Sequence, residues 1–304
     1  MDKVHGEKLY KLLDNKKLPS TDIPRVQKAI ERYERWVRDL NTAEYSDIDS
    51  AVEGMVSLLN DYKLYVDVDL IFDSENDFLY RQKGQLKLDN TVMEEFLPHL
   101  VRKCIAYANV GVELEIDSQA KVFSSIHFES SITSPAQGGG MQIKSKDQDF
   151  SIYRPLYIQA SHNEDMSQAV ELSTCLGYVC AELKTNLDKT MFQEASATAH
   201  DVRVAVTGAK YYLLADYLDM SPISTSTTDI EEIMVLRKAK RLGSGIRSNY
   251  STFAGRQAGR NEYVSYLKEH PYSAEVFKRF ISKLLEQISS ENLSEEEVLS
   301  EGWF

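Results

Sequence analysis

The sequence predicts an α/β fold in which a mainly helical N-terminal region precedes a region of strands. In the first region apolar residues recur every three or four positions, as they do on the buried face of a helix. This pattern occupies residues 22–41, 46–62 and 89–108. From about residue 110 apolar and polar residues alternate instead, most clearly in 121–131, and that period is typical of strands. We therefore expect a helical region over 1–110 and an α/β region over 111–304.

The further elements of the second region follow from their patterns. Residues 149–161 have the pattern of a strand, and Pro155 places it at an edge or a bulge. Residues 177–183 have few polar side chains, which favours a central strand. A helix is expected to follow, capped near Asn186 or Asp188. The later predicted elements are a buried strand or helix at 209–219, a helix at 229–242, a Gly- and Ser-rich loop at 243–260, a helix at 273–290 and an acidic tail at 291–304.

The composition limits the classes of protein that fit. No apolar run approaches the ~18 residues of a membrane span, and the polar N-terminus has no apolar signal-peptide core. The three cysteines, at 104, 175 and 180, are too few for a disulfide framework, and no Cys/His spacing indicates zinc. We therefore expect a protein of the reducing cytoplasm, without a membrane partner.

Charge is distributed unevenly along the chain. The formal net charge of −12 argues by itself against a nucleic-acid partner. Residues 233–261, however, contain no acid. Their seven cations are Arg237, Lys238, Lys240, Arg241, Arg247, Arg256 and Arg260. Such cations neutralise phosphates, and arginine also recognises guanine through paired hydrogen bonds. All of them except Arg237 are our candidate DNA-contacting residues.

Two charged residues, Glu182 and Lys184, come at the end of the apolar segment that starts at residue 177. In a strand, side chains at i and i+2 project to the same side, so the pair can share one site. A carboxylate is a hard oxygen ligand for magnesium, and an ammonium group can orient an attacking water. The same acid-x-Lys spacing starts at residues 14 and 61, but in helical segments, where i and i+2 do not share a face.

A metal site of this kind needs a second acid on a neighbouring strand. Asp147 and Asp149 come just before the apolar run that starts at Phe150 in the expected strand 149–161. The two acids share one face if the backbone is extended. Asp149 directly abuts that run and is preferred, with Asp147 as the alternative. Glu171 and Asp165 are weaker candidates, because they precede the strand of Glu182 itself.

A longer set of residues resembles one group of enzymes. The strings KSKDQDFSI at 144–152 and AELKTNLDKTMFQEA at 181–195, followed by AKYYLLADYLDMSPIS and VLRKAKRL, are similar to type II restriction endonucleases of the DdeI and BbvCI group. Those enzymes cut interrupted sites of the CTNAG or CCTNAGC kind. The resemblance covers roughly a third of the chain. It implies the fold of the PD-(D/E)xK nuclease superfamily, a mixed central β-sheet flanked by helices, and the use of Mg²⁺.

Carried onto matching positions, the resemblance implies Asp149, Glu182 and Lys184 as catalytic residues, with Asp149 and Glu182 holding the Mg²⁺ ion. The sequence departs from the superfamily pattern in one respect, because Gln148 stands where the motif has proline. This leaves the choice between Asp147 and Asp149 open. Gln193 and Glu194, on the helix after the pair, are accessory candidates.

The resulting hypothesis is a magnesium-dependent, sequence-specific endonuclease for double-stranded DNA, part of a restriction–modification system. A non-catalytic DNA-binding subunit, or a repair or recombination nuclease of the same fold, is the alternative. A complete acid–acid–lysine set favours the enzyme. One such set cuts one strand and the chain shows no repeat, so we expect a dimer of like or unlike subunits. Region 1–110 has no evident chemistry and is expected to be a scaffold, a subunit contact or a DNA contact.

Overall fold

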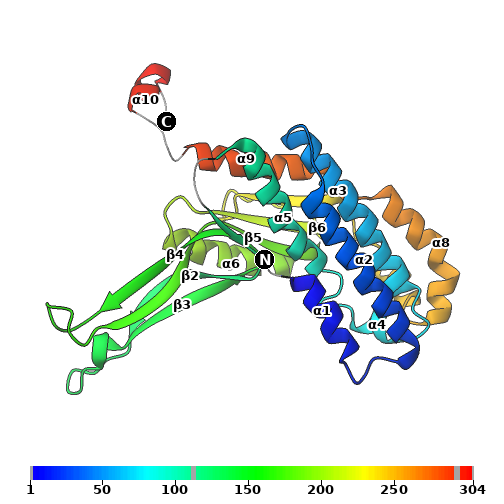
Figure 1. Cartoon of the computed structure of the whole chain (residues 1–304), viewed down its shortest axis with the longest axis horizontal. Helices are drawn as coiled ribbons and strands as arrows, with labels where there is room; N and C mark the ends of the chain where they lie inside the picture. Colours follow the sequence, from blue (N-terminus) through cyan, green and yellow to red (C-terminus); the bar gives the residue numbers. More distant parts are fainter. Residues whose placement is uncertain (1–2, 111–113, 291–294, 303–304) are drawn as a thin grey trace.

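A mixed β-sheet lies between two layers of helices (Figure 1) in the computed structural model, which describes residues 3–110, 114–290 and 295–302. The strands are β1 (Glu115–Asp117), β2 (Ala120–Phe128), β3 (Met141–Gln148), β4 (Phe150–Ala160), β5 (Val170–Leu187), β6 (Lys210–Leu218) and β7 (Glu232–Lys240). The helices are α1 (Val4–Leu13), α2 (Ile23–Thr42), α3 (Ile48–Tyr65), α4 (Asp77–Gln82), α5 (Thr91–Ala108), α6 (Lys189–Ala205), α7 (Ser244–Asn249), α8 (Phe253–Glu269), α9 (Ala274–Ser290) and α10 (Glu295–Glu301). The 3₁₀ turns η1 (Ser20–Asp22) and η3 (Gln137–Gly140) and the π-helix η2 (Val66–Phe72) complete the elements.

The strand β5 organises the sheet. Its first part pairs antiparallel with β4, from Val170 to Ala181, and its last part pairs parallel with β6, from Val179 to Leu187. β7 then pairs parallel with β6, whereas β1 pairs with β4 and β3 with β2 in antiparallel ladders. The sheet is therefore mixed, as the resemblance implied.

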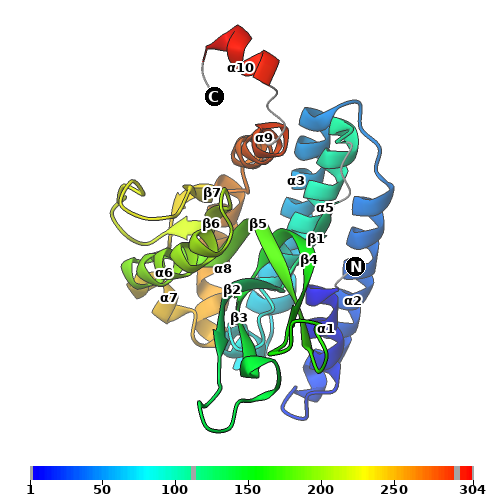
Figure 2. The ribbon, with the colours of Figure 1, turned by 90° about the vertical axis from the view of Figure 1, so that its left-hand side faces the viewer.

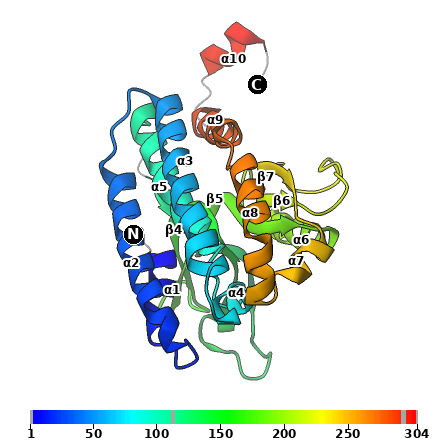
Figure 3. The same ribbon diagram turned by 90° about the vertical axis from the view of Figure 1, so that its right-hand side faces the viewer.

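The two faces of the sheet are buried by different helices (Figure 2). On one face Phe150, Ala181 and Leu183 pack into the core of α1, α2, α3, α5 and α9. On the other face Cys180 and Tyr211 pack against α6. Because neighbouring residues of a strand point to opposite faces, Glu182 and Lys184 project to the α6 side. The N-terminal helices lie beside one another over the opposite face (Figure 3).

The strands β2, β3, β4 and the first part of β5 extend away from the helices as an arm (Figure 1). Residues 129–143 and 156–171, which include the ends of this arm, contain four acids and no Lys or Arg. Phe128 and Tyr157 are largely exposed there. The tip of the arm is therefore unsuited to neutralising phosphates.

Most of the expected elements are confirmed, including helices in 22–41, 46–62 and 89–108 and strands in 149–161 and 177–183. Residues 209–219 form the strand β6. The helix expected at 229–242 is wrong, because these residues form β7 and pair with β6 at the end of the sheet.

The loop expected at 243–260 is also wrong. It contains α7 and the first half of α8. Thr252 caps α8 by accepting a hydrogen bond from the Gly255 amide, and this starts the helix despite its glycines. Part of the acidic tail forms α10. The start of the predicted strand region, 111–113, lies outside the described residues. Within the described residues, none of the helices combines the length and the apolarity that a membrane crossing requires.

Candidate active site

Glu182 and Lys184 form an ion pair on β5, with 2.6 Å between Lys184 Nζ and Glu182 Oε1. Both side chains are partly exposed, by 19% and 26%, so a substrate can reach them. Tyr211, on β6, donates a hydrogen bond of 2.9 Å to Glu182 Oε2. The parallel ladder sets Tyr211 opposite Cys180, which puts its side chain on the same face as Glu182. The carboxylate is thus held from both sides.

Asp149 occupies the turn between β3 and β4, beside this pair. Its Oδ2 accepts a hydrogen bond of 2.8 Å from the amide of Leu183, the residue between Glu182 and Lys184. The register that sets Phe150 opposite Ala181 brings the turn to this point. Asp147 instead lies on β3, exposed and opposite Lys121. The geometry therefore brings Asp149, rather than Asp147, next to the pair.

A third carboxylate, Glu94 on α5, lies near enough to influence Asp149. The pKa of Asp149 is raised to about 6, mainly by burial and then by the charges of Glu94 and Glu182. The hydrogen bond from the Leu183 amide acts in the opposite direction. Glu94 is fully buried and accepts hydrogen bonds from Asn90 and Gln119, at 3.0 and 2.9 Å. The site consequently concentrates negative charge.

Glu94 and Tyr211 are not among the site residues that the sequence predicted. Two consecutive acids in a helix with many apolar residues, Glu94 and Glu95, were an available signal. The sequence did not show that the two acids have different surroundings. In the structure Glu95 turns away from the site and accepts hydrogen bonds from the His5 amide and the Tyr33 hydroxyl. Tyr211 had no signal at all, since its role depends on the pairing of β5 with β6.

The charge on Lys184 is supported by its neighbours. Burial by itself would lower its pKa, but the hydrogen bond and charge of Glu182, with Asp149 and Glu194, outweigh burial and raise it. Glu194 thus lies within electrostatic range of the site, on α6. Gln193 is exposed beside it. Asp188 caps α6 by accepting a hydrogen bond of 2.9 Å from the Met191 amide, as expected.

The donors fit a hard divalent cation. Asp149 uses Oδ2 for the Leu183 amide, and its Oδ1 has no hydrogen-bond partner among the described residues. Burial, and after it the charges of Glu94 and Glu182, raise the pKa of Asp149, and a bound cation would counter this by stabilising the ionised carboxylate. Within the described part of the chain no group of three His, Cys, Asp or Glu forms a ready metal cluster. Two carboxylates suit Mg²⁺, which completes its shell with waters and substrate phosphates.

The basic residues divide into paired and unpaired groups. Apart from the buried Arg256, three of the candidate DNA-contacting residues form ion pairs: Lys238 with Glu275, Arg241 with Asp219, and Arg260 with Asp73. Lys240 is exposed on β7 and has no acidic partner within the described ranges. The Arg247 Nε donates to the carbonyl of Leu242 at 2.9 Å, which leaves its terminal nitrogens available.

Arg256 is not a DNA-contacting residue, contrary to expectation, because its side chain is fully buried. Its guanidinium donates to the carbonyls of Phe72, Ser74 and Tyr250 at 2.8 to 3.1 Å and pairs with Asp77 at 3.1 Å. These bonds tie α8 to the end of η2 and to α4. Arg256 therefore stabilises the fold.

A mixed sheet between helices, with two acids and a lysine meeting at its centre, defines a nuclease-type site. A sequence model of the Bpu10I restriction endonuclease matches residues 85–304. The chain belongs to the Bpu10I restriction endonuclease family and is a type II restriction endonuclease. Such enzymes bind DNA and generally use a divalent metal.

One solved structure shows the same fold. The native BbvCI A2B2 tetramer, solved at low resolution, matches with a TM-score of 0.60 and 18% sequence identity. The match covers 90% of this chain and 100% of the BbvCI chain. It includes most of the N-terminal helices, which the family match does not reach. A search of curated proteins found no match.

Replacing Arg256 by Met should lower the free energy of unfolding by about 3–5 kcal/mol, because three buried carbonyls and Asp77 lose their donor. Urea denaturation followed by circular dichroism measures this loss. The control is Arg260→Met, which removes a more exposed pair and should cost less than about 1 kcal/mol. Equal, small losses in both variants would contradict the structural role of Arg256.

Proposed function

We propose that this enzyme hydrolyses double-stranded DNA at a specific site with Mg²⁺, held by Asp149 and Glu182, and with Lys184 as the water-positioning residue. The observation that carries the proposal is the meeting of three groups around Leu183: the Glu182–Lys184 ion pair and the Asp149 carboxylate on the intervening amide. The full set of charged groups favours an active nuclease over a binding-only subunit.

Each protein group has a role that follows from its contacts. Lys184 stays protonated beside Glu182, so it donates hydrogen bonds to the attacking water rather than taking its proton. Tyr211 fixes the Glu182 carboxylate and acts as a positioning residue. Mg²⁺, when bound, supplies Lewis-acid stabilisation of the charge that develops on the phosphate. Water adds to phosphorus as the bond to the 3′ oxygen breaks. One proton of the water passes to solvent, and the departing 3′ oxygen takes a proton from solvent. The products are a 5′-phosphate and a 3′-hydroxyl.

We further propose that the target is an interrupted site of the CTNAG or CCTNAGC kind, that cleavage takes place in the cytoplasm, and that the chain works as part of a restriction–modification system. The support is the resemblance of residues 144–152 and 181–195 to enzymes with such sites. Distinct bands from a plasmid digest would support a specific site, whereas a smear would indicate a nuclease without one.

Glu182→Ala and Asp149→Ala should each abolish plasmid cleavage in Mg²⁺, because each removes an oxygen ligand, and Lys184→Ala should slow it by about 10²–10³-fold. The matched control is Asp147→Ala, which should cleave within about twofold of wild type because Asp147 points to solvent on β3. Gel-shift assays should show DNA binding retained in all four variants. An inactive Asp147→Ala together with an active Asp149→Ala would reverse the assignment.

Lys240→Ala should weaken DNA binding and reduce the slope of log affinity against log salt concentration by about 1, because one phosphate contact is lost. Lys238→Ala is the control from the same strand, since its ammonium group is already paired with Glu275. Its slope should change less. Fluorescence anisotropy at several salt concentrations gives both slopes. A larger change in the Lys238 variant would place the DNA elsewhere.

We propose that a double-strand break needs a second copy of this site, in a like or an unlike subunit. The support is one acid–acid–lysine set in the chain and the A2B2 assembly of the structurally similar BbvCI. The helices of region 1–110 are the candidate contact. The expected result is a dimer or larger species in light scattering with target DNA. Nicking of one strand by the pure chain would indicate a missing unlike subunit, and double-strand cleavage by a monomer would refute the proposal.

A further inference from the structure

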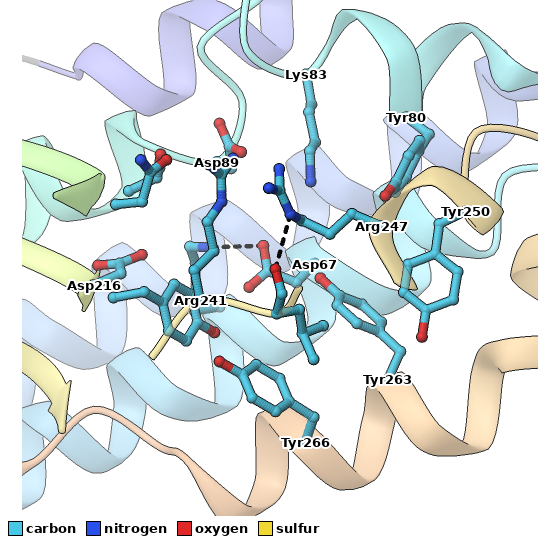
Figure 4. A pocket seen from close by; sticks show the side chains of 15 residues that line it. Asp67, Tyr80, Lys83, Asp89, Asp216, Arg241, Arg247, Tyr250, Tyr263 and Tyr266 are labelled. Carbon is cyan, nitrogen blue, oxygen red and sulfur yellow. Dashed lines mark hydrogen bonds and ion pairs between the residues drawn. The ribbon is translucent and has the colours of Figure 1, made fainter. Parts of the chain in front are cut away.

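A cavity of about 140 Å³ opens directly beyond the candidate active site (Figure 4). Thr185 and Asn186, the residues that follow Lys184 on β5, form part of its wall. The remaining walls come from the end of α3, from η2, α4, β6, α7 and α8. The cavity and the Glu182–Lys184 pair therefore share one stretch of β5.

The floor of the cavity is built from buried charges that balance one another. Lys63 Nζ lies 2.5 Å from Asp67 Oδ1, and Arg237 lies 3.7 Å from the other oxygen of Asp67. Asp216 accepts a hydrogen bond of 2.9 Å from the Tyr272 hydroxyl. Two cations and two carboxylates give this floor no net charge. It presents carboxylate acceptors without attracting an anion deep into the cavity.

The backbone is irregular at two places on this floor. Asp67 belongs to the π-helix η2, a rare geometry that often marks functional sites. Asp216 lies where the register between β6 and β7 shifts, and Lys238 on the facing strand has a φ of 48°. A bulge and a left-handed residue cost energy and are retained where they orient a particular side chain. Both irregularities bring carboxylates to the same cavity.

Two cations of the cavity lining, Lys83 and Arg247, form no ion pair within the described residues, although the Asp89 carboxylate also lines the cavity. Lys83 Nζ lies 4.8 Å from the ring centre of Tyr80, and the Arg247 guanidinium touches only the Leu242 carbonyl. Neither has an acidic partner within the described residues. Figure 4 shows the ammonium group of Lys83 and the guanidinium group of Arg247 next to each other in this view. Two unpaired cations brought together favour a multiply charged anion such as a phosphate.

The walls are aromatic and the space fits one ring. Tyr217 and Tyr266 stack with 5.7 Å between ring centres, and Tyr263 turns its hydroxyl toward the interior in Figure 4. A cavity of 140 Å³ compares with the ~150 Å³ known to hold one benzene. A six-membered base fits this space, whereas the fused rings of a purine exceed it.

We propose that this cavity binds a pyrimidine nucleotide, with its phosphate between Lys83 and Arg247 and its base among the tyrosines. The carboxylates of the floor favour a base with an amino donor, as in cytosine. In bound DNA the occupant is a nucleotide rotated out of the helix next to the scissile phosphate. That source rests on the proposed function, whereas a free nucleotide would use the same contacts.

The first experiment titrates dCMP, dAMP and inorganic phosphate separately into the full chain by calorimetry. We expect dCMP to bind at least about tenfold more tightly than the other two. Lys83→Ala and Arg247→Ala should each weaken dCMP binding by about fivefold or more. The matched control is Lys268→Ala, which removes an exposed charge on α8 outside the cavity and should change nothing.

The second experiment identifies the source of the nucleotide. The cleavage-inactive Glu182→Ala variant is mixed with target duplexes that carry pyrrolocytosine at successive positions. A fluorescence increase at one position, lost in the double variant with Arg247→Ala, assigns the cavity to an unstacked DNA base. No increase at any position, with dCMP binding retained, assigns it to a free nucleotide. Absence of both signals overturns the proposal, and dCMP binding does not depend on whether the chain cleaves DNA.

Discussion

The backbone pairing of β5 is the constraint on which the rest of the structure depends. The backbone of this strand forms an antiparallel hydrogen-bond ladder with β4 on one edge and a parallel ladder with β6 on the other. The two ladders overlap near Val179–Ala181, and further back Cys175 pairs with β4 on one edge and with Val122 of β2 on the other. Glu182 and Lys184 come directly after this overlap. β4 begins only at Phe150, opposite Ala181, so Asp149 in the preceding turn can accept a hydrogen bond from the Leu183 amide.

That geometry explains how charged groups occupy the centre of an apolar sheet. Each is compensated: Glu182 by Lys184 and Tyr211, and Asp149 by a backbone amide. Compensation of Asp149 is nevertheless incomplete, because burial, and after it the charges of Glu94 and Glu182, raise its pKa. The folded site therefore retains excess negative charge, which a bound cation would offset. Until a cation binds, repulsion among the carboxylates lowers the stability of the fold.

The helical layer contributes to the site and is not only a support. α5 brings Glu94 toward Asp149, and the end of α4 with the start of η2 brings Lys83 and Asp67 to the neighbouring cavity. Arg256 fixes this second group by tying α8 to the carbonyls of Phe72 and Ser74. Buried polar anchors of this kind specify one arrangement, because any displacement leaves a carbonyl unpaired.

The sequence by itself determined the local features. Period-two alternation and the i, i+2 rule place Glu182 and Lys184 on one face of a strand, and the Asp188 cap starts α6. These depend only on backbone geometry within a few residues. Tertiary structure decided the rest. Residues 232–240 are a strand because β6 offers an unpaired edge, and Arg256 is buried because α8 packs on η2. Glu94 and Tyr211 reach the site through pairings between segments distant in the chain, where hydrogen bonding and burial override local propensity.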